Sequence, residues 1–168
     1  MRRIAILIED LFDDKELIYP YYRIQEAGFT VDLIGSIGNH MYKSKFGMPI
    51  KSDLGSKDIS ATDYEAVIIP GGFSPDYMRR TQTTIDFVRA MDSLQKTIAS
   101  ICHGPWLMIS ACSLKDKKLT GFHSIKVDIE NAGASYLDQA VVVDGHLITS
   151  RTPADLPLFV KTLIDKLH

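Results

Sequence analysis

Four short runs of this chain are mostly apolar and do not alternate strictly between polar and apolar residues, and this pattern limits the possible folds more than any other feature. The runs lie at residues 3–9, 30–35, 66–70 and 96–101. A strand of a parallel sheet is covered on both faces and is therefore apolar along its length, whereas a strand with one wet face alternates. Segments with helical periodicity separate the runs, as crossovers between parallel strands require. The pattern predicts a three-layer α/β/α sandwich with a mostly parallel central sheet.

Helices and two further β segments are predicted outside these runs. The helices lie at residues 16–27, 81–94 and 103–112. Residues 36–60 are more polar and contain glycine, so we expect a small hairpin that leaves the sheet. Residues 140–150 are expected to form a β segment around the turn Asp144-Gly145.

Three helix starts are marked by their capping residues. Thr152-Pro153-Ala154-Asp155 has the residues of a capping box with proline at the first helical position, and Ser74-Pro75-Asp76 repeats this order of cap and proline. Asp13 is expected to cap the first helix, with Glu16 at its third position. Pro20 lies inside that helix, where its missing N–H should bend or interrupt the helix.

Length and composition predict one domain and argue against several kinds of partner. A chain of 168 residues with 45% hydrophobic content is expected to form one domain over residues 1–168. Nineteen basic and 21 acidic side chains give a net charge of −2, so neither nucleic acid nor a membrane is a predicted partner. Two cysteines are too few for a disulfide framework and are typical of the reducing cytoplasm. The expected partner is a small molecule or a peptide.

The pentapeptide Ser100-Ile101-Cys102-His103-Gly104 lies at the end of the fourth apolar run. A small residue two positions before a nucleophile and a glycine two positions after it let strand and helix approach closely, so the nucleophile occupies a sharp, strained turn. The first N–H groups of the helix and its dipole would then favour the thiolate of Cys102 over the thiol. The pattern indicates a nucleophile elbow and covalent chemistry.

Three segments with reactive or flexible residues follow strands of the predicted sheet. They are the stretch from Asp13 to Glu16, the pair Gly71-Gly72 and the pair Cys102-His103. Because ligands bind beyond the carboxyl ends of parallel strands, these segments should meet in one pocket. The N–H groups of the glycines and of His103 are the predicted donors to an oxyanion.

Five separated segments, which together span essentially the whole chain, resemble a known family. They are Glu16-Leu17-Ile18-Tyr19-Pro20, Ile69-Pro70-Gly71-Gly72-Phe73-Ser74-Pro75-Asp76, Ala99-Ser100-Ile101-Cys102-His103-Gly104-Pro105, Asn131-Ala132-Gly133-Ala134 and Ser150-Arg151-Thr152-Pro153-Ala154-Asp155-Leu156. They resemble the ThiJ/PfpI superfamily, and more narrowly its PfpI-like intracellular protease branch. The resemblance implies a flavodoxin-like sandwich of the class I glutamine amidotransferase-like type, which forms homodimers and sometimes larger rings such as hexamers.

The resemblance also implies roles for individual residues. Cys102 matches the nucleophile, Glu16 the acidic residue that hydrogen-bonds its sulfur, and His103 the general base of the protease branch. Asp76 matches a position, often glutamate, that reaches the histidine from a neighbouring subunit. Gly72 and the backbone of His103 match the oxyanion hole. The implied activities are peptidase action, cofactor-free conversion of methylglyoxal to lactate, and removal of early glycation adducts from proteins.

Each candidate residue also has a structural alternative. Glu16 could only complete a capping box, and Asp76 could only be a favourable charge in a first helical turn. Neighbours one residue apart on a helix do not share a face, so the side chain of His103 could point away from the nucleophile. Cys112 is expected to be an inert buried residue within its helix.

We therefore expect a cytoplasmic enzyme in which the Cys102 thiolate attacks a carbonyl carbon of a dicarbonyl compound or a peptide. No metal or cofactor is predicted, because the histidines and cysteines show no ligand spacing. Phe122 stands where the family often has a pocket tyrosine. His123 could line the pocket instead, or could lie on an exposed loop.

Two other classes of function remain open from the sequence. A redox sensor or stress-protective chaperone would use Cys102 as an oxidisable thiol, with a sulfinate held by Glu16. A glutamine amidotransferase would share the elbow but would need a downstream histidine, which Pro153-Ala154-Asp155 does not offer.

Overall fold

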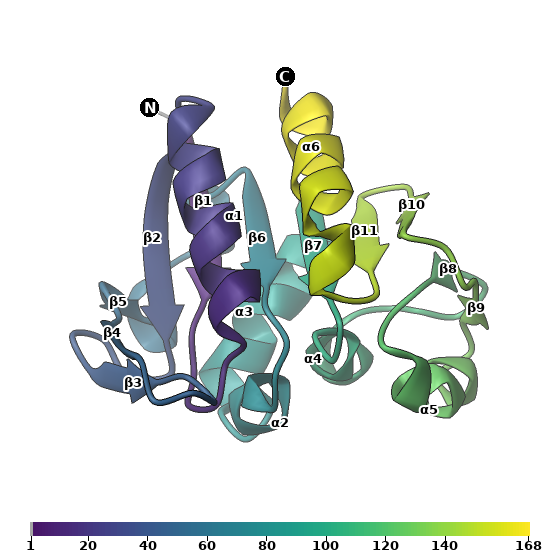
Figure 1. Cartoon of the computed structure of the whole chain (residues 1–168), viewed down its shortest axis with the longest axis horizontal. Coiled ribbons are helices and arrows are strands. Elements are labelled where there is room, and N and C mark those ends of the chain that lie inside the picture. Colours follow the sequence, from purple (N-terminus) through teal and green to yellow (C-terminus); the bar gives the residue numbers. More distant parts are fainter. Residues whose placement is uncertain (1) are drawn as a thin grey trace.

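The computed structural model describes residues 2–168 and contains a seven-stranded sheet between two layers of helices (Figure 1). The strand order is β10-β11-β7-β6-β1-β2-β5. β10 is antiparallel to β11, and the other neighbours are parallel. The bounds are β1 (Arg3–Leu7), β2 (Thr30–Gly35), β5 (Leu54–Gly55), β6 (Ala66–Ile69), β7 (Thr97–Ile101), β10 (Val141–Asp144) and β11 (Leu147–Ser150). The predicted fold class is confirmed.

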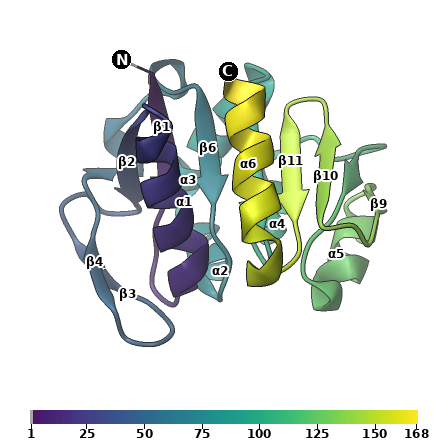
Figure 2. The ribbon, with the colours of Figure 1, turned by 45° about the horizontal axis from the view of Figure 1, so that its top comes forward.

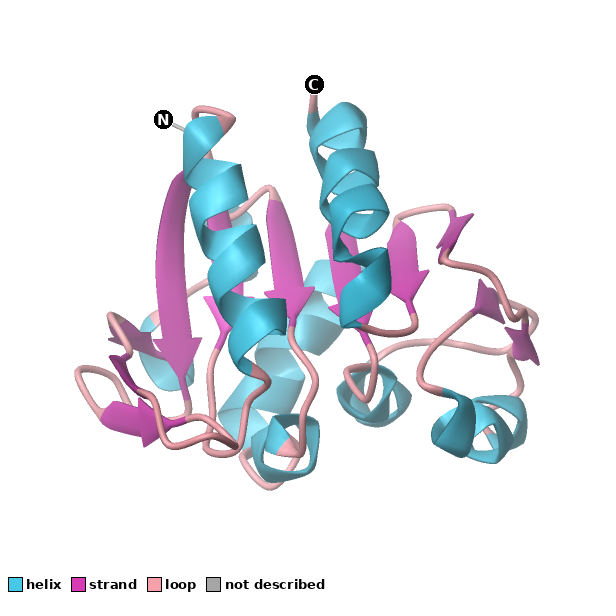
Figure 3. Cartoon of the chain, in the orientation of Figure 1, coloured by secondary structure: helices cyan, strands magenta, loops and turns pink. Residues whose placement is uncertain are grey.

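Helices cover both faces of the sheet, as Figures 2 and 3 show. α1 (Asp14–Glu26) and α6 (Leu156–Leu167) lie on one face, and α3 (Gln82–Ser93) and α4 (Pro105–Ala111) lie on the other. Two shorter helices are α2 (Ser74–Met78) and α5 (Lys126–Asn131). No helix within residues 2–168 is long and apolar enough to cross a membrane.

Successive residues of the central strands point to opposite helical layers, which divides the core in two. In β1, Ile4 and Ile6 pack with residues of α1 and α6, whereas Ala5 and Leu7 pack with residues of α3 and α4. All four of these side chains are buried. Because both faces of the strand are dry, its residues are apolar at successive positions and do not alternate with polar ones.

Two small strand pairs lie outside the main sheet. β3 (Met41–Lys43) and β4 (Pro49–Lys51) form the hairpin predicted within residues 36–60. β8 (Lys118–Leu119) and β9 (Ser135–Tyr136) flank α5 and were not predicted, because two-residue strands have no measurable period. The β10–β11 hairpin is confirmed, but its turn is Gly145-His146 rather than Asp144-Gly145, with Gly145 at φ 59°.

The start of α1 is as predicted, whereas its interior is not. The Asp13 carboxylate accepts hydrogen bonds from two N–H groups of the first turn, at 3.0 and 3.2 Å. α1 runs through Pro20 without interruption, although proline has no N–H for the helical ladder. Pro20 is buried on the same face as Leu17 and Ile24, and the packing of this face offsets the missing hydrogen bond.

Neither of the other two predicted caps forms a capping hydrogen bond. The Thr152 side chain makes no capping bond, and a 3-10 turn over Pro153–Asp155 precedes α6. The carboxylate of Asp155 pairs with Arg151 at 3.0 Å instead of reaching back to Thr152. Ser74 is the first residue of α2 rather than its cap, and its hydroxyl donates at 2.9 Å to the carbonyl three residues earlier. The side chains of Asp155 and Ser74, which a capping arrangement would use, are thus bonded to other groups.

The predicted elbow is present between β7 and α4. Cys102 has a φ of 62°, in the left-handed region that non-glycine residues rarely adopt. A Cβ on Gly104 would lie 2.3 Å from Oγ of the buried Ser100 and 2.7 Å from the carbonyl oxygen of Ile69. Strand and helix start therefore approach as closely as an elbow requires. The helix itself begins at Pro105, two residues later than predicted.

This close approach predicts a cost for any side chain at position 104. We expect Gly104→Ala to lower the free energy of unfolding by about 1–3 kcal/mol, because an added methyl must displace packed neighbours. Urea unfolding followed by circular dichroism measures the change. The double variant Ser100→Ala/Gly104→Ala should recover only part of the loss, since the contact with the Ile69 carbonyl remains. Wild-type stability in Gly104→Ala would contradict the packing.

Candidate active site

A cavity of about 390 Å³ lies where the segments after β1, β6 and β7 meet. It is lined by Leu11, Asp13, Glu16, Lys45, Gly72, Phe73, Cys102, His103, Phe122 and Pro153. The three segments predicted to converge at the carboxyl edge of the sheet therefore share one pocket. This pocket contains a thiol, an imidazole, a buried carboxyl group and an ammonium group.

One wall of the pocket comes from the β3–β4 hairpin, which no sequence motif linked to the site. Nζ of Lys45, in the loop of this hairpin, pairs with the carboxylate of Asp13 at 2.5 Å. The Ser44 hydroxyl donates to Asp14 at 2.7 Å, and the Lys45 N–H donates to the carbonyl of Phe12 at 3.0 Å. The hairpin is thus fastened to the first turn of α1. In the sequence, a lysine in a polar loop looks no different from a solvated surface residue.

Glu16 is fully buried, and its carboxylate contacts the segment after β6. Oε2 accepts a hydrogen bond from the N–H of Gly71 at 2.7 Å, so Glu16 does not complete a capping box. A Cβ on Gly71 would lie 2.5 Å from Oε2 and 2.8 Å from Cβ of Cys102, which only glycine avoids. The N–H of Gly71 is therefore occupied, and its predicted role as an oxyanion donor is wrong.

Burial, and to a lesser degree the neighbouring Asp13 carboxylate, raises the pKa of Glu16 from 4.5 to about 7. The hydrogen bond from Gly71 acts in the opposite direction but is outweighed. Glu16 is therefore poised to hold or release a proton near neutral pH.

The sulfur of Cys102 receives backbone donors from two directions. The backbone N–H groups of His103 and Gly72 act on it by lowering the pKa of the thiol. Burial and the Glu16 carboxylate raise that pKa by more, so it lies above its ordinary value while Glu16 is ionised. The expectation that the start of the helix favours the thiolate is therefore wrong while Glu16 is ionised.

Two buried negative charges in contact are strongly unfavourable, so Glu16 and Cys102 titrate as a coupled pair. When the carboxyl group holds the proton, it can donate a hydrogen bond to the thiolate, and the repulsion disappears. The pair can therefore present a thiolate only if Glu16 is the group that stays protonated. This arrangement makes the proton of Glu16 part of the chemistry of the thiol.

The imidazole of His103 lies beside the nucleophile, with Nδ1 3.3 Å from Sγ of Cys102. The alternative that it points elsewhere is wrong, because both residues belong to the turn before α4 rather than to the helix. Phe122 stacks on the ring with centroids 5.0 Å apart, and Trp106 contacts it nearly edge-on at 4.9 Å. Burial and the positive charge of Lys45 lower the pKa of His103, which favours the neutral imidazole that can accept a proton.

Besides Gly71, two residues named from the sequence lie outside the lining of the pocket. Asp76 is in α2, where its carboxylate pairs with Arg79 at 3.0 Å and with Arg80 at 2.6 Å. Its action on the histidine of a neighbouring subunit remains a prediction. His123 is exposed, and Phe122 rather than His123 lines the pocket.

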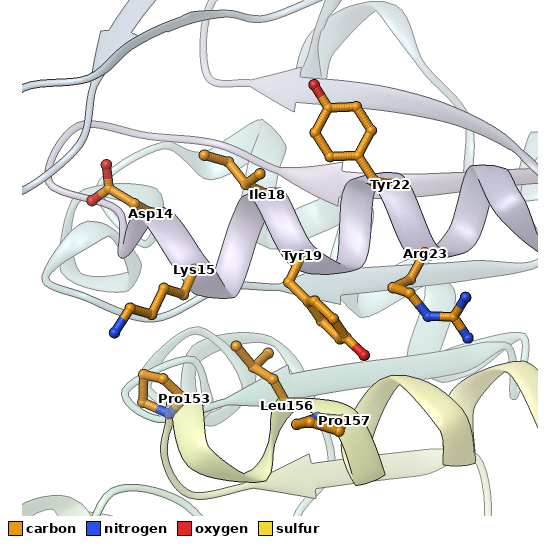
Figure 4. Close-up of a pocket in the computed structure, with 9 residues that line it drawn as sticks. All are labelled: Asp14, Lys15, Ile18, Tyr19, Tyr22, Arg23, Pro153, Leu156 and Pro157. Carbon is orange, nitrogen blue, oxygen red and sulfur yellow. The ribbon is translucent and has the colours of Figure 1, made fainter.

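A larger cavity of about 520 Å³ lies between α1 and α6 (Figure 4). It is lined by Asp14, Lys15, Ile18, Tyr19, Tyr22, Arg23, Pro153, Leu156 and Pro157. Its lining contains neither a thiol nor an imidazole, so the smaller cavity around Cys102 is the candidate active site. Pro153 lines both cavities, which are therefore neighbours. Across residues 2–168, no group of three or more His, Cys, Asp and Glu residues could hold a metal ion.

Fold and site together define an α/β sandwich protein with a cysteine on the elbow between a strand and a helix. Residues 2–166 match the model of the DJ-1/PfpI family, and the chain belongs to this family. "Deglycase PfpI" of Pyrococcus furiosus is 36% identical over 162 residues, which cover 96% of this chain and 97% of that protein. "Putative cysteine protease YraA" of Bacillus subtilis is 40% identical over 158 residues, which cover 94% of each.

A solved structure from Anabaena variabilis extends the comparison to the fold. This two-domain protein contains DJ-1/ThiJ/PfpI-like and ferritin-like domains, and it matches with a TM-score of 0.97 at 43% identity. The match covers 99% of this chain and 48% of the other, so the present chain spans about half of that protein. The flavodoxin-like fold and the resemblance to the ThiJ/PfpI superfamily are confirmed.

The raised pKa of Glu16 predicts a pH-dependent stability. Between its ordinary value of 4.5 and about 7, the folded chain keeps a proton that the unfolded chain has released. The stability that depends on this proton is therefore present in full below pH 4.5 and is lost as the pH rises through 7. Relative to Glu16→Gln, which cannot ionise, the wild type should lose about 3 kcal/mol between pH 4 and pH 8.

Urea unfolding at several pH values measures this difference. Glu26→Gln, at the exposed end of α1, is the matched control and should follow the wild type. Parallel stability curves for wild type and Glu16→Gln would show that Glu16 has an ordinary pKa.

Proposed function

We propose that this chain is an enzyme whose Cys102 attacks the carbonyl carbon of a small dicarbonyl compound or an early glycation adduct. The observation that carries the proposal is the set of groups around the sulfur. Nδ1 of His103 lies 3.3 Å away, and the backbone N–H groups of His103 and Gly72 lower the pKa of the same thiol. A base and two backbone donors around one thiol suit nucleophilic attack on a carbonyl group.

In the proposed first step, Nδ1 of His103 accepts the thiol proton as Sγ of Cys102 bonds to the carbonyl carbon. The π electrons of the carbonyl move to its oxygen, which becomes an oxyanion. This oxyanion accepts hydrogen bonds from the N–H groups of Gly72 and His103. The imidazolium then returns the proton to the oxygen or to a leaving amine. Protonated Glu16 supports the thiolate before attack by donating a hydrogen bond to it.

The dimensions of the pocket favour a small substrate over a folded protein chain. A cavity of about 390 Å³ accommodates a dicarbonyl compound, a sugar-derived adduct or a few residues of peptide. The relative of Pyrococcus furiosus that is named a deglycase supports the first two. Hydrolysis of short peptides is the second candidate activity, because it needs the same nucleophile and base and because YraA is named a cysteine protease.

We further propose that the enzyme works in the cytoplasm as a homodimer or a larger homo-oligomer, as the family resemblance implies. Cys102 and Cys112 are both free thiols, which suits a reducing compartment. Cys112 follows the last turn of α4 rather than lying within it, and burial raises the pKa of its thiol. An unreactive Cys112 is therefore the expectation.

The two cysteines provide a matched test of the nucleophile. Cys102→Ala should lower kcat/KM by at least about 10³-fold, because the attacking atom is removed. Cys112→Ala should stay within about twofold of wild type, since surface and half-buried truncations away from a site have small effects. Activity is measured on methylglyoxal and on fluorogenic peptides. Full activity of Cys102→Ala on every substrate that the wild type converts would contradict the assignment.

The redox alternative makes a different prediction for peroxide. If the chain is an enzyme, turnover should fall in proportion to the oxidation of Cys102, followed by intact-mass spectrometry during a peroxide titration. Cys112→Ala should oxidise and lose activity in the same way. Oxidation that stops at a sulfinate on Cys102, in a protein that converts no carbonyl substrate before treatment, would favour the sensor instead.

A further inference from the structure

The imidazole of His103 has a second polar neighbour, on the side away from the thiol. Nε2 lies 3.4 Å from Oγ of Ser124, while Nδ1 lies 3.3 Å from Sγ of Cys102. Ser124 belongs to the short 3-10 turn His123–Ile125 that precedes α5. The two ring nitrogens therefore each face one side chain of the same chain. No part of this arrangement requires a second subunit.

Aromatic contacts hold the ring in this orientation. Phe122 stacks on the imidazole, with an angle of 28° between the rings, and Trp106 meets it at 66°. The Trp106 indole is itself fixed, because its N–H donates to the carboxylate of Asp128 at 2.9 Å. With the ring held by these two contacts, its function as a base depends on which nitrogen carries the proton. That choice depends on the hydrogen-bond partners of the nitrogens.

The acidic residue that the family resemblance links to this histidine is engaged elsewhere. Asp76 accepts hydrogen bonds from Arg79 and Arg80 of its own chain, and these bonds lower its pKa. Arg79 also lies over the ring of Trp106, with its guanidinium carbon 5.2 Å from the ring centroid. Asp76 is thus part of a surface ion-pair cluster in α2, whereas Ser124 lies at the histidine.

We propose that Ser124 is a positioning residue that accepts a hydrogen bond from Nε2–H of His103 and so leaves the Nδ1 lone pair free for the Cys102 thiol. The hydroxyl remains a suitable acceptor after proton transfer, because the imidazolium still carries a proton on Nε2. A serine can therefore serve both protonation states without ionising. The inference rests on the proposed function only in treating His103 as the base.

The test compares Ser124→Ala with Ser124→Thr, which keeps the hydroxyl. Ser135→Ala, an exposed serine in β9, is the matched control. The first readout is independent of catalysis: the imidazole ¹⁵N chemical shifts of His103 report which nitrogen carries the proton. Ser124→Ala should move both shifts toward a mixture of tautomers, and Ser124→Thr should restore the wild-type values.

The second readout is the pH profile of kcat/KM. Loss of an acceptor for Nε2–H destabilises the protonated imidazole and lowers the pKa of His103, so the acidic limb of the Ser124→Ala profile should move to lower pH. The value of kcat should fall roughly three- to tenfold, with little change in KM. The other titratable and charged groups that face His103 are Cys102, Lys45, Asp128 and His123, and the substitution leaves all of them in place.

Two outcomes would overturn the proposal. One is a Ser124→Ala variant with the ¹⁵N shifts and pH profile of Ser135→Ala. The other is a Ser124→Thr variant that behaves like Ser124→Ala, because the hydroxyl would then not be the relevant group. A failure of the proposed function can be told apart from a failure of this inference. Full activity of Cys102→Ala would contradict the nucleophile assignment, whereas the ¹⁵N shifts would still test the contact between Ser124 and His103.

Discussion

The hydrogen bond between the N–H of Gly71 and the buried carboxylate of Glu16 connects the end of β6 to the first turn of α1. Cβ of Cys102 lies close to the same point, so a side chain on Gly71 would collide with both neighbours. Three segments far apart in the sequence are thus held at contact distance around one carboxyl group. The raised pKa of Glu16 follows from this enclosure, and the coupling between its proton and the thiol follows in turn.

The sheet could be predicted from the sequence because its central strands are dry on both faces, which leaves each of them mostly apolar without a regular polar alternation. The shortest elements could not. β5, β8 and β9 have two residues each, too few to show a period, and tertiary contacts hold them in place. The prediction of two helix caps failed because the side chains of Ser74 and Asp155 bond to groups that are not part of a capping arrangement. Capping rules work where no other nearby group competes for the same side chain.

The reactive residues of the pocket could also be predicted, because parallel strands bring their carboxyl ends to one edge whatever the detailed packing. The pKa values of these residues could not be predicted from the sequence. Whether a thiol next to a helix start is acidic depends on its burial and on the charge of Glu16, and neither is visible in a motif. The orientation of His103 was left open for a similar reason, since two aromatic rings fix it and only one of them, Trp106, is near it in the sequence.

The ion pair between Lys45 and Asp13 brings a residue from outside the main sheet to the pocket. The reacting groups stand on the ends of core strands and on the first turn of α1, whereas Lys45, which also lines the pocket, lies in a loop outside the sheet. Its ammonium charge acts on both Glu16 and His103 and lowers the pKa of each. A loop that is not part of the core therefore influences where the protons of the reaction centre reside.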